Sequence, residues 1–501
     1  MKSSRVLGAL LASCLMAAPA LATDLRIGLQ EDPDVLDTDQ ARTFVGRIVF
    51  ESLCDKLINT APDLSFVPEL ATGWSWSEDG LELTMKLREG VVFHDGTPFD
   101  AAAVVANIDR SQNLPESRRK SELSSVARVE ALGDHEVKFT VSAPDATLLA
   151  QLSDRAGMML SPTAFAAAGL DFGAAPVCSG EYRFVERVEQ DRIVLEKFAD
   201  YYNADAYSFD RVIFLPIPDT TVRLANVRSG DLDMLERLAP SDLAAVKADG
   251  NLVAAEAVSI GYQAITVNVG NGERANTPFG QDKRVRQALS WALDRAVINQ
   301  VVFEGAYAPG NQPFAPNSPW YDASNPVPPR DVDKARALLA EAGLERVAIE
   351  MQAANSPVQL QLMQVIQSMA AEAGIDISIK ATEFATMLAE QTEGRFEATQ
   401  VGWSGRTDPD GNIHTFVTCE GGQNDSKYCN PEVDRLLNAA RRSNDMAVRK
   451  ESYDAANRIL GDELPIIYLY HPTWLWALRS NVSGFVAHPD GMIRLAGVKT
   501  E

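Results

Sequence analysis

The chain has 501 residues, of which 69 are acidic and 46 basic, so its formal net charge is −23 at pH 7. This acidic balance argues against nucleic-acid binding, which depends on Lys and Arg side chains that neutralise phosphates. The length exceeds what a single hydrophobic core supports, so we expect two or more lobes.

The N-terminus has the pattern of a secretory signal peptide. Two basic residues precede an apolar run over 6–18, which is too short to span a bilayer. The tripeptide at 20–22 matches the A-x-A pattern that signal peptidase reads, so we place cleavage after Ala22 and the mature protein in the periplasm. The alternative is a lipobox that would attach a lipid to Cys14. We prefer the soluble form, because the residues after Cys14 are apolar and do not form a polar tether.

The first half of the mature chain alternates short strands and helices. Periodicity predicts strands at 25–29, 81–87, 193–195 and 212–214. Asp100 is expected to cap a short helix with valine and isoleucine on one face. The segment 220–229 is predicted to be a helix that ends at Gly230.

The second half is more regular. Apolar residues at a 3.6-residue spacing predict one helix over 284–303, and a second helix is expected at 331–342. A third helix is expected to begin after Ser356, as its N-cap, and to end at Gly374. An alternating strand follows at 375–379. This mixture with short connections predicts α/β architecture.

Two strands are expected to carry the chain between lobes. The segment 262–269 alternates apolar and polar residues where the helix-rich half begins. The segment 465–470 is almost continuously apolar and ends that half. We interpret both as crossover strands.

Cysteine usage agrees with export to an oxidising compartment. Outside the signal peptide there are four cysteines, which allow three pairings: Cys54, Cys178, Cys419 and Cys429. Cys419 and Cys429 bracket a loop rich in Gly and Asn, which favours a local disulfide between them. Cys54 with Cys178 then follows by elimination. A metal site is disfavoured, since there is no C-x-x-C motif.

The segment 402–412 concentrates groups suited to a small zwitterion. Beside three glycines and a proline that favour turns, it carries the side chains of Trp403, Arg406, Asp408 and Asp410. Such a loop can present a fixed cation and a fixed anion to a molecule with a carboxylate at one end and an amine at the other. The alternative is a surface turn whose Asp and Arg cap neighbouring helices.

Several motifs in this order resemble one known family. They are Pro-Glu-Leu-Ala-Thr-Gly-Trp at 68–74, Arg-Glu-Gly-Val-Val-Phe-His-Asp-Gly at 88–96, Pro-Phe-Asp at 98–100, the segment 268–295, the loop at 403–412 and Cys-Asn-Pro-Glu-Val-Asp at 429–434. Together they span nearly all of the mature chain. They resemble the family 5 extracellular solute-binding proteins, which are the peptide, opine and nickel receptors of ABC importers.

The resemblance implies a two-lobed α/β fold of the periplasmic binding protein type (class II, cluster C), with ligand trapped between the lobes. It places the parts of the fold as follows: the lobe I core at 23–60, 179–261 and 471–501, an inserted subdomain at 61–178, and lobe II at 262–470. It also implies permease subunits in the inner membrane as partners. We expect a monomer without cofactor, bound metal or nucleic acid.

The resemblance also implies roles for the loop residues. In dipeptide- and oligopeptide-binding relatives an aspartate of this loop receives the ligand's α-amine; Asp408 aligns best with it and Asp410 second best. Arg406 departs from the family pattern, and we interpret it as a carboxylate clamp. The ligand would then be rich in carboxylates, such as a γ-glutamyl peptide, an opine or an acidic peptide. Alanine at Asp408 or Arg406 should weaken binding and leave the unliganded protein as stable as before.

Further candidate ligand contacts come from this loop and from two distant segments. They are Trp403, which can stack on the ligand, its neighbours Ser404 and Gly405, Tyr262 at the start of a crossover strand, and Arg42 in a loop after the first strand. For Trp403 and Tyr262 the alternative is an ordinary packing role.

Two other functions compete with this hypothesis. A secreted hydrolase is disfavoured because Arg406 replaces the last glycine of a G-x-S-x-G motif and no H-E-x-x-H motif is present. We therefore expect no enzymatic activity. A metal-chelate receptor of the nickel type is the alternative within the family, since His414 lies four residues beyond Asp410. A lone histidine, however, is more often a hydrogen-bonded structural residue.

Overall fold

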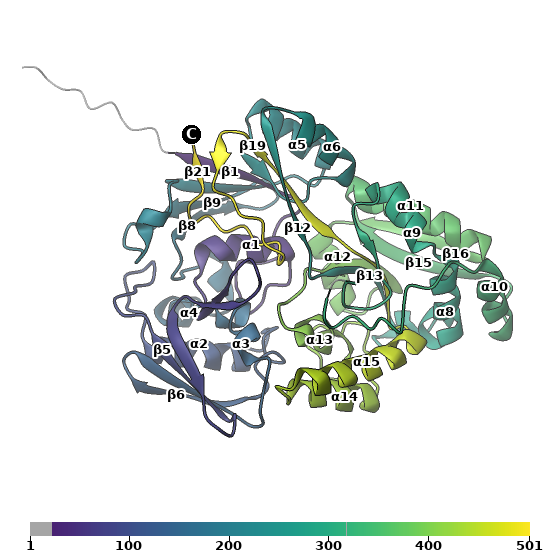
Figure 1. Ribbon diagram of the computed structural model, residues 1–501, viewed down its shortest axis with the longest axis horizontal. Helices are drawn as coiled ribbons and strands as arrows, with labels where there is room; N and C mark the ends of the chain where they lie inside the picture. The colour runs from purple at the N-terminus through teal and green to yellow at the C-terminus, as the bar shows by residue number, and fades with distance from the viewer. Residues whose placement is uncertain (1–22, 317) are drawn as a thin grey trace, which may run out of the picture.

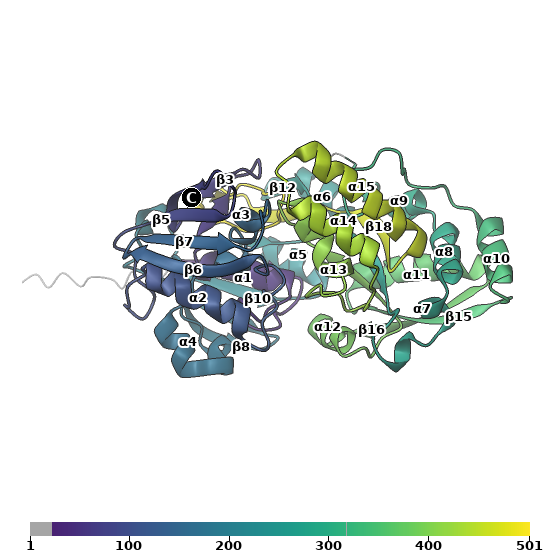
Figure 2. The same cartoon turned by 90° about the horizontal axis from the view of Figure 1, so that it is seen from below.

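Residues 23–316 and 318–501 are described by the computed structural model. They form two lobes that lie side by side, each built on its own β-sheet (Figure 1 and Figure 2). In Figure 1, lobe I contains the purple and blue elements and lobe II the green ones. The cleavage expected after Ala22 and the alternative lipid site at Cys14 lie outside the described residues.

Lobe I is built on a seven-stranded mixed sheet. Its strand order is β12 (Leu252–Val258), β19 (Thr473–Arg479), β11 (Met234–Leu235), β1 (Asp24–Leu29), β10 (Arg211–Pro216), β9 (Arg192–Lys197) and β8 (Tyr182–Val188). β1 lies between β11 and β10 and runs parallel to both. The segments that follow β1 and β11 therefore leave the sheet on the same side, at the carboxyl ends of these strands.

A four-stranded antiparallel sheet packs beside this core within lobe I. Its order is β4 (Ala71–Trp76), β5 (Glu82–Leu87), β7 (Glu136–Val141) and β6 (Val126–Gly133). It buries its own apolar cluster, which includes Leu83, Met85 and Phe139. Two small ribbons complete the strands of the lobe: β2 (Ile58–Thr60) with β3 (Phe66–Pro68), and β20 (Val482–Ser483) with β21 (Lys499–Thr500).

Lobe II is built on a six-stranded sheet. Its order is β14 (Ala308–Pro309), β18 (Ile466–His471), β13 (Tyr262–Val267), β17 (Ala398–Trp403), β15 (Val347–Ala354) and β16 (Ile375–Thr382). Leu289, Leu362 and Ile366 of the covering helices pack against the sheet in a core separate from that of lobe I.

The two predicted crossover strands occur as β13 and β18. β12 belongs to lobe I and β13 to lobe II, and the chain returns from β18 in lobe II to β19 in lobe I. Because β12 pairs with β19 and β13 with β18, the two crossings, at 259–261 and at Pro472, lie next to each other. The domain boundaries given above stay a prediction.

The helices begin largely where capping residues predict. They are α1 (Phe44–Leu53), α2 (Ala101–Asn113), α3 (Leu148–Gln151), α4 (Pro162–Ala168), α5 (Thr220–Ser229), α6 (Leu243–Ala248), α7 (Pro278–Gln281), α8 (Lys283–Ala292), α9 (Arg295–Phe303), α10 (Val332–Glu341), α11 (Pro357–Glu372), α12 (Phe384–Thr392), α13 (His414–Val417), α14 (Pro431–Arg441) and α15 (Met446–Glu463). The side chains of Asp100 and Ser356 cap α2 and α11 as expected.

The prediction of one continuous helix over 284–303 is wrong. Leu293 is extended, and the side chain of Asp294 accepts a hydrogen bond from the Val297 amide (3.0 Å). Asp294 is therefore the N-cap of a second helix, and the apolar stripe continues across the break because both helices cover the same sheet.

Both predicted disulfides are present: Cys54 is bonded to Cys178, and Cys419 to Cys429. Within the described part of the chain, no helix is both long enough and apolar enough to cross a membrane.

Candidate ligand-binding site

A cavity lies between the lobes and takes its lining from both. Its empty volume, including open solvent at the mouth, is about 980 Å³. The aromatic lining consists of Phe44, Phe384, Trp403, Phe416 and Trp474. The charged lining consists of Glu31, Arg42 and Arg237 from lobe I and Asp425 from lobe II.

Arg237 is held in an unusual position on the lobe I side. Its φ of 50° lies in the left-handed region, which is rare for residues other than glycine and is often retained at functional sites. Arg223 donates a hydrogen bond to the Arg237 carbonyl (3.1 Å) and supports this backbone. The guanidinium lies over the stacked rings of Phe44 and Trp474, 4.8 and 5.2 Å from their centroids. Its Nε lies 3.4 Å from Glu236 Oε2, as an ion pair without a hydrogen bond.

Glu31 is the buried carboxyl next to this cation. Burial raises the pKa of Glu31 to about 7, the charge of Arg237 offsets part of the rise, and the carboxylate of Glu236 adds to it. A raised pKa means that the surrounding positive charge does not fully stabilise the ionised carboxylate, so a further cation would be bound favourably. The cavity thus offers an acceptor for a ligand ammonium beside a donor for a ligand carboxylate.

Arg42 connects the two lobes across the cavity. It follows β1 in lobe I, and its Nη2 pairs with Asp425 Oδ2 of lobe II at 2.6 Å. Its Nη1 donates to the Leu388 carbonyl (3.1 Å) and to the Thr392 hydroxyl, both on α12 of lobe II. This set of contacts can form only when the lobes are closed.

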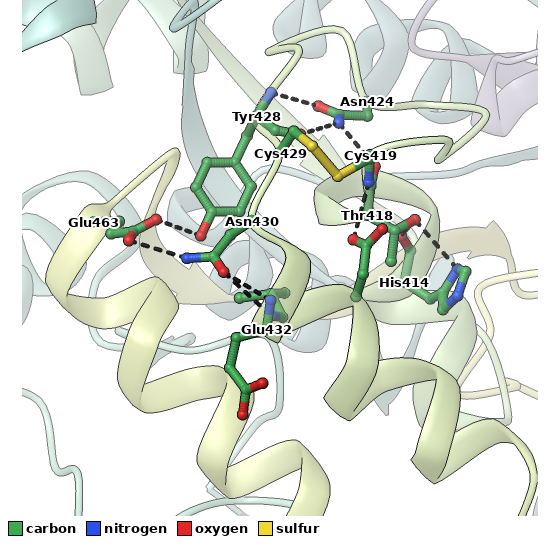
Figure 3. Close-up of a disulfide and its surroundings, with 11 residues drawn as sticks. His414, Thr418, Cys419, Asn424, Tyr428, Cys429, Asn430, Glu432 and Glu463 are labelled. Carbon is green, nitrogen blue, oxygen red and sulfur yellow. Dashed lines mark hydrogen bonds between the residues drawn. A yellow bond between two sulfur atoms is a disulfide. The ribbon is translucent and has the colours of Figure 1, made fainter.

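The loop that presents Asp425 is closed by the disulfide of Cys419 and Cys429 (Figure 3). Inside it, Asn424 donates to the Tyr428 carbonyl (2.6 Å), and the Tyr428 hydroxyl contacts Glu463 on α15. Three side chains of this loop line the cavity: Gln423, Asp425 and Ser426. The disulfide therefore orders one wall of the site.

Trp403 and Ser404 line the cavity, as the sequence hypothesis requires. Trp403 ends β17, and its indole N–H donates to Asn412 Oδ1 (3.0 Å). The same oxygen accepts from the Arg406 amide (2.7 Å), and the Asn412 side chain donates back to the Arg406 carbonyl (3.0 Å). Asn412 thus folds the loop and fixes where Trp403 and Ser404 stand.

Arg406 lies behind the cavity wall and is not among the lining residues. Its Nε contacts Asp154 of lobe I, its Nη1 donates to the Gly405 carbonyl (2.8 Å), and its guanidinium carbon lies 4.0 Å from the centre of a Trp403 ring. Gly405 has φ +88°, and a Cβ there would meet the Ile260 carbonyl carbon at 2.5 Å. Gly405 therefore serves the fold of the loop.

The two loop aspartates pair with arginines of lobe II. Asp408 Oδ1 lies 2.6 Å from Arg449 Nη2, and Asp410 Oδ2 lies 2.6 Å from Arg441 Nη2. Neither aspartate lines the cavity. Their assignment as receivers of a ligand amine stays a prediction.

The remaining candidates lie away from the cavity lining. Tyr262 is buried between Phe416 and Tyr468, and its hydroxyl has no hydrogen-bond partner in the described structure. His414 is buried and its Nε2 lies 3.2 Å from Asn438 Oδ1. No group of three or more His, Cys, Asp or Glu side chains that could hold a metal ion occurs among residues 23–316 and 318–501.

The sequence hypothesis did not include Glu31 and Arg237. Glu31 lies just beyond β1 and Arg237 just beyond β11, and these strands are parallel neighbours. Ligands of α/β proteins bind beyond the carboxyl ends of such strands. The position of Glu31 just after a predicted strand could have identified it from the sequence. Arg237 could not be identified in this way, because β11 has only two residues and is too short to be recognised as a strand.

Comparison with known proteins finds one matching family model and related proteins that align over nearly the whole chain. The family model described as bacterial extracellular solute-binding proteins, family 5 middle, matches residues 65–424. The glutathione-binding protein GsiB of Pectobacterium atrosepticum is 30% identical over 494 residues, which cover 95% of this chain and 94% of GsiB. GsiB of Escherichia coli O157:H7 is 28% identical over 495 residues, covering 96% and 94%.

Solved structures confirm the expected two-lobed α/β fold. The binding protein AgaA of A. tumefaciens R10, in complex with agropinic acid, has a TM-score of 0.85 at 25% identity and covers 95% of this chain and 99% of AgaA. The dipeptide-binding protein of Pseudoalteromonas sp. SM9913, in complex with Met-Leu, has a TM-score of 0.88 at 24% identity and covers 95% of this chain and 100% of that protein.

Proposed function

We propose the following role for this chain, which belongs to the bacterial extracellular solute-binding proteins, family 5: it is the periplasmic receptor of an ABC importer and closes on a small, amino-acid-derived zwitterion. It then delivers this ligand to permease subunits in the inner membrane. It acts by binding, without a chemical step.

The observation that carries the proposal is that Glu31 and Arg237 both line the cavity between the lobes. Closure removes water from the cavity, and each charge there is worth more in a low-dielectric site than in water. A ligand with only a cation would pair with Glu31 and bring no carboxylate to Arg237, and a ligand with only an anion would pair with Arg237 and leave the Glu31 carboxyl without a cation. A molecule with an ammonium beside a carboxylate satisfies both groups.

The relatives support a ligand of this class. Glutathione, named for GsiB, is a γ-glutamyl tripeptide with an α-amine and two carboxylates. Agropinic acid, bound by AgaA, belongs to the opines, which are amino-acid conjugates. A γ-glutamyl peptide and an opine are two of the three ligand classes that the sequence favours, the third being an acidic peptide.

The residues proposed to contact the ligand combine the sequence candidates with the cavity. Arg237 clamps a carboxylate, Glu31 receives the ammonium, and Trp403 provides an apolar face. Ser404 and Arg42 complete the polar contacts. The proposed roles of Arg406, Asp408, Asp410, Gly405 and Tyr262 are to support this wall from behind.

A thermal-shift panel on ligand-stripped protein tests the function. The panel contains glutathione, γ-glutamylglycine, an opine, neutral dipeptides and nickel–histidine. A compound that binds only the folded state adds to the free energy of unfolding by mass action, about 2.7 kcal/mol at a concentration of 100 Kd. The melting temperature therefore rises. We expect the carboxylate-rich amino-acid conjugates to give the largest shifts. A shift with nickel–histidine alone, or cleavage of a panel peptide, contradicts the proposal.

A further inference from the structure

A cluster of buried charges lies directly behind Ser404, on the side away from the cavity. It brings together four guanidinium groups and two carboxylates, which we call the guanidinium cluster: Arg47, Arg119, Arg155, Arg406, Asp154 and Glu122. All of them are at least nine-tenths buried. Arg406 comes from lobe II and the others from lobe I, so lobe closure completes the cluster.

The charges of the cluster do not balance. Asp154 is shared by Arg47 (Nε to Oδ1, 3.1 Å) and Arg406, and Glu122 pairs with Arg119. The guanidinium of Arg155 has no carboxylate partner in the described structure. Two carboxylates for four guanidinium groups leave a formal surplus of two positive charges. The next carboxylate near Arg47, Asp490, is paired with Arg494 at 2.8 Å.

Several N–H groups of the cluster also lack an acceptor. Arg155 Nη1 donates to the Ala41 carbonyl (2.7 Å), but Arg155 Nε and Nη2, Arg406 Nη2 and Arg119 Nε have no hydrogen-bond partner among the described residues. Burial, followed by the charge of Arg119 and that of the other arginines, lowers the pKa of Arg155 well below its usual value. Unpaired buried cations are costly, so this arrangement calls for an anion.

Ser404 lies between the guanidinium cluster and the cavity. Its hydroxyl oxygen accepts from Arg47 Nη1 (2.9 Å) and lies 3.4 Å from Arg406 Nη1. A hydroxyl has two acceptor lone pairs and one hydrogen, so an oxygen that faces two donors is left with only its O–H to offer. Ser404 lines the cavity. Its O–H is therefore available to an acceptor on the ligand, in a region of positive potential.

We propose that the Ser404 end of the cavity is a carboxylate subsite, in which a second carboxylate of the ligand accepts the Ser404 O–H and compensates the guanidinium cluster behind it. This proposal rests on the proposed function and narrows its ligand. The ligand carries an ammonium and a carboxylate for Glu31 and Arg237, and a further carboxylate at its other end. A neutral dipeptide lacks that group.

Calorimetry with pairs of acids and amides tests the subsite. The probes are glutathione and its glycine amide, γ-glutamylglycine and its glycine amide, and L-alanyl-L-glutamate with L-alanyl-L-glutamine. We expect each acid that binds to do so at least tenfold more tightly than its amide. In Arg155→Met the preference for the acid should fall severalfold, while the unliganded melting temperature stays level or rises, because a buried charge without a partner has been removed.

Ser404→Ala provides the second variant and should reduce the same preference without removing a charge. Acids and amides that bind wild type equally overturn the subsite and leave the proposed function intact. Equal losses for acid and amide in Arg155→Met also overturn it, since a structural role acts on both. If none of the six probes binds, the subsite is overturned for peptide ligands, and the thermal-shift panel, which includes an opine, decides the proposed function separately.

Discussion

In the proposed function, Glu31 and Arg237 bind the charged groups of the ligand, and Asp408 and Arg406 support the cavity wall from behind. The loop motif predicts a cation and an anion close together, and the structure does bring them together with partners of their own. Asp154 lies far upstream in the chain, and nothing local to Arg406 reveals that it pairs with this guanidinium. Pairing between distant charges depends on tertiary structure, so spacing in a motif cannot determine which charges remain available to a ligand.

At the residue scale, Arg237→Gln should weaken binding of the panel compound that binds best. Loss of one buried partner of a charge pair costs about 2–5 kcal/mol, so we expect an increase in Kd of at least about thirtyfold by calorimetry. Arg237→Lys keeps the charge without the planar fork and should recover part of the loss. Arg128→Gln, at an arginine whose side chain is 69% exposed, is the matched control. An unchanged Kd in Arg237→Gln removes this residue from the site.

The raised pKa of Glu31 predicts that ligand binding depends on pH. In the unliganded protein the carboxyl holds its proton up to about pH 7, and a bound ammonium favours the ionised form. Binding therefore releases a proton, and affinity should fall as the pH drops from 7.5 to 5.5, by up to about tenfold per pH unit. Glu31→Gln should abolish this slope. The same slope in the variant would assign the titration to another group.

The same carboxyl affects the stability of the unliganded protein. Folded Glu31 keeps its proton up to about pH 7, whereas the unfolded chain releases it near the ordinary value of 4.5. The folded state thus binds more protons between these values, and stability falls as the pH rises through this window. We expect Glu31→Gln to raise the melting temperature at pH 8 and to leave it almost unchanged at pH 4.

The ion pairs change the expected outcome at Asp408. Arg449 is buried and bonded to Asp408, so Asp408→Ala leaves a buried cation unpaired. Breaking such a pair costs about 3–5 kcal/mol of unfolding free energy, which urea denaturation measures. Asp408→Asn keeps an acceptor and should cost less. A variant that loses ligand at full stability would restore the role of Asp408 as a direct ligand contact.

At the scale of elements, capping residues and periodicity predict the structure well. Asp100 and Ser356 cap helices as predicted, because their side chains satisfy local amides whatever the rest of the chain does. The break between α8 and α9 was missed because both helices share one apolar face. The strand β11 was missed because its two residues depend on their neighbours in the sheet.

The disulfide of Cys419 and Cys429 provides a test at this scale. It closes the loop that presents Gln423, Asp425 and Ser426 to the cavity, so replacing both cysteines by serine should weaken ligand binding severalfold. The loss of stability should be about 3 kcal/mol or less, given the short loop. The matched control replaces Cys54 and Cys178, which do not line the cavity. If both double variants bind ligand with the same affinity, the Cys419–Cys429 disulfide does not order the loop for binding.

At the scale of the whole molecule, the two lobes and their crossings follow from the sequence, but the contacts between the lobes do not. The switch from one sheet to the other at 259–261 and at Pro472 was visible as two apolar strands around the helix-rich half. Arg42 was a candidate, yet its partners on α12 and in the disulfide loop depend on how the lobes meet.

Arg42 also predicts how the molecule closes. Arg42→Gln removes the ion pair with Asp425 and weakens the contacts to α12, so the unliganded protein should open further. We expect a larger radius of gyration in small-angle scattering and a weaker affinity for the best panel compound. Arg183→Gln, at an arginine that pairs with Glu196 within lobe I, is the control. An unchanged radius with unchanged affinity shows that Arg42 does not contribute to closure.

We propose that this chain carries a carboxylate-rich, amino-acid-derived zwitterion between its lobes. Mass spectrometry of the small molecules released by denaturing natively purified protein tests it most directly. We expect one predominant amino-acid conjugate with an amine and at least two carboxylates, absent when Arg237→Gln is purified in the same way. A ladder of neutral peptides of mixed length, or a nickel chelate, would contradict it.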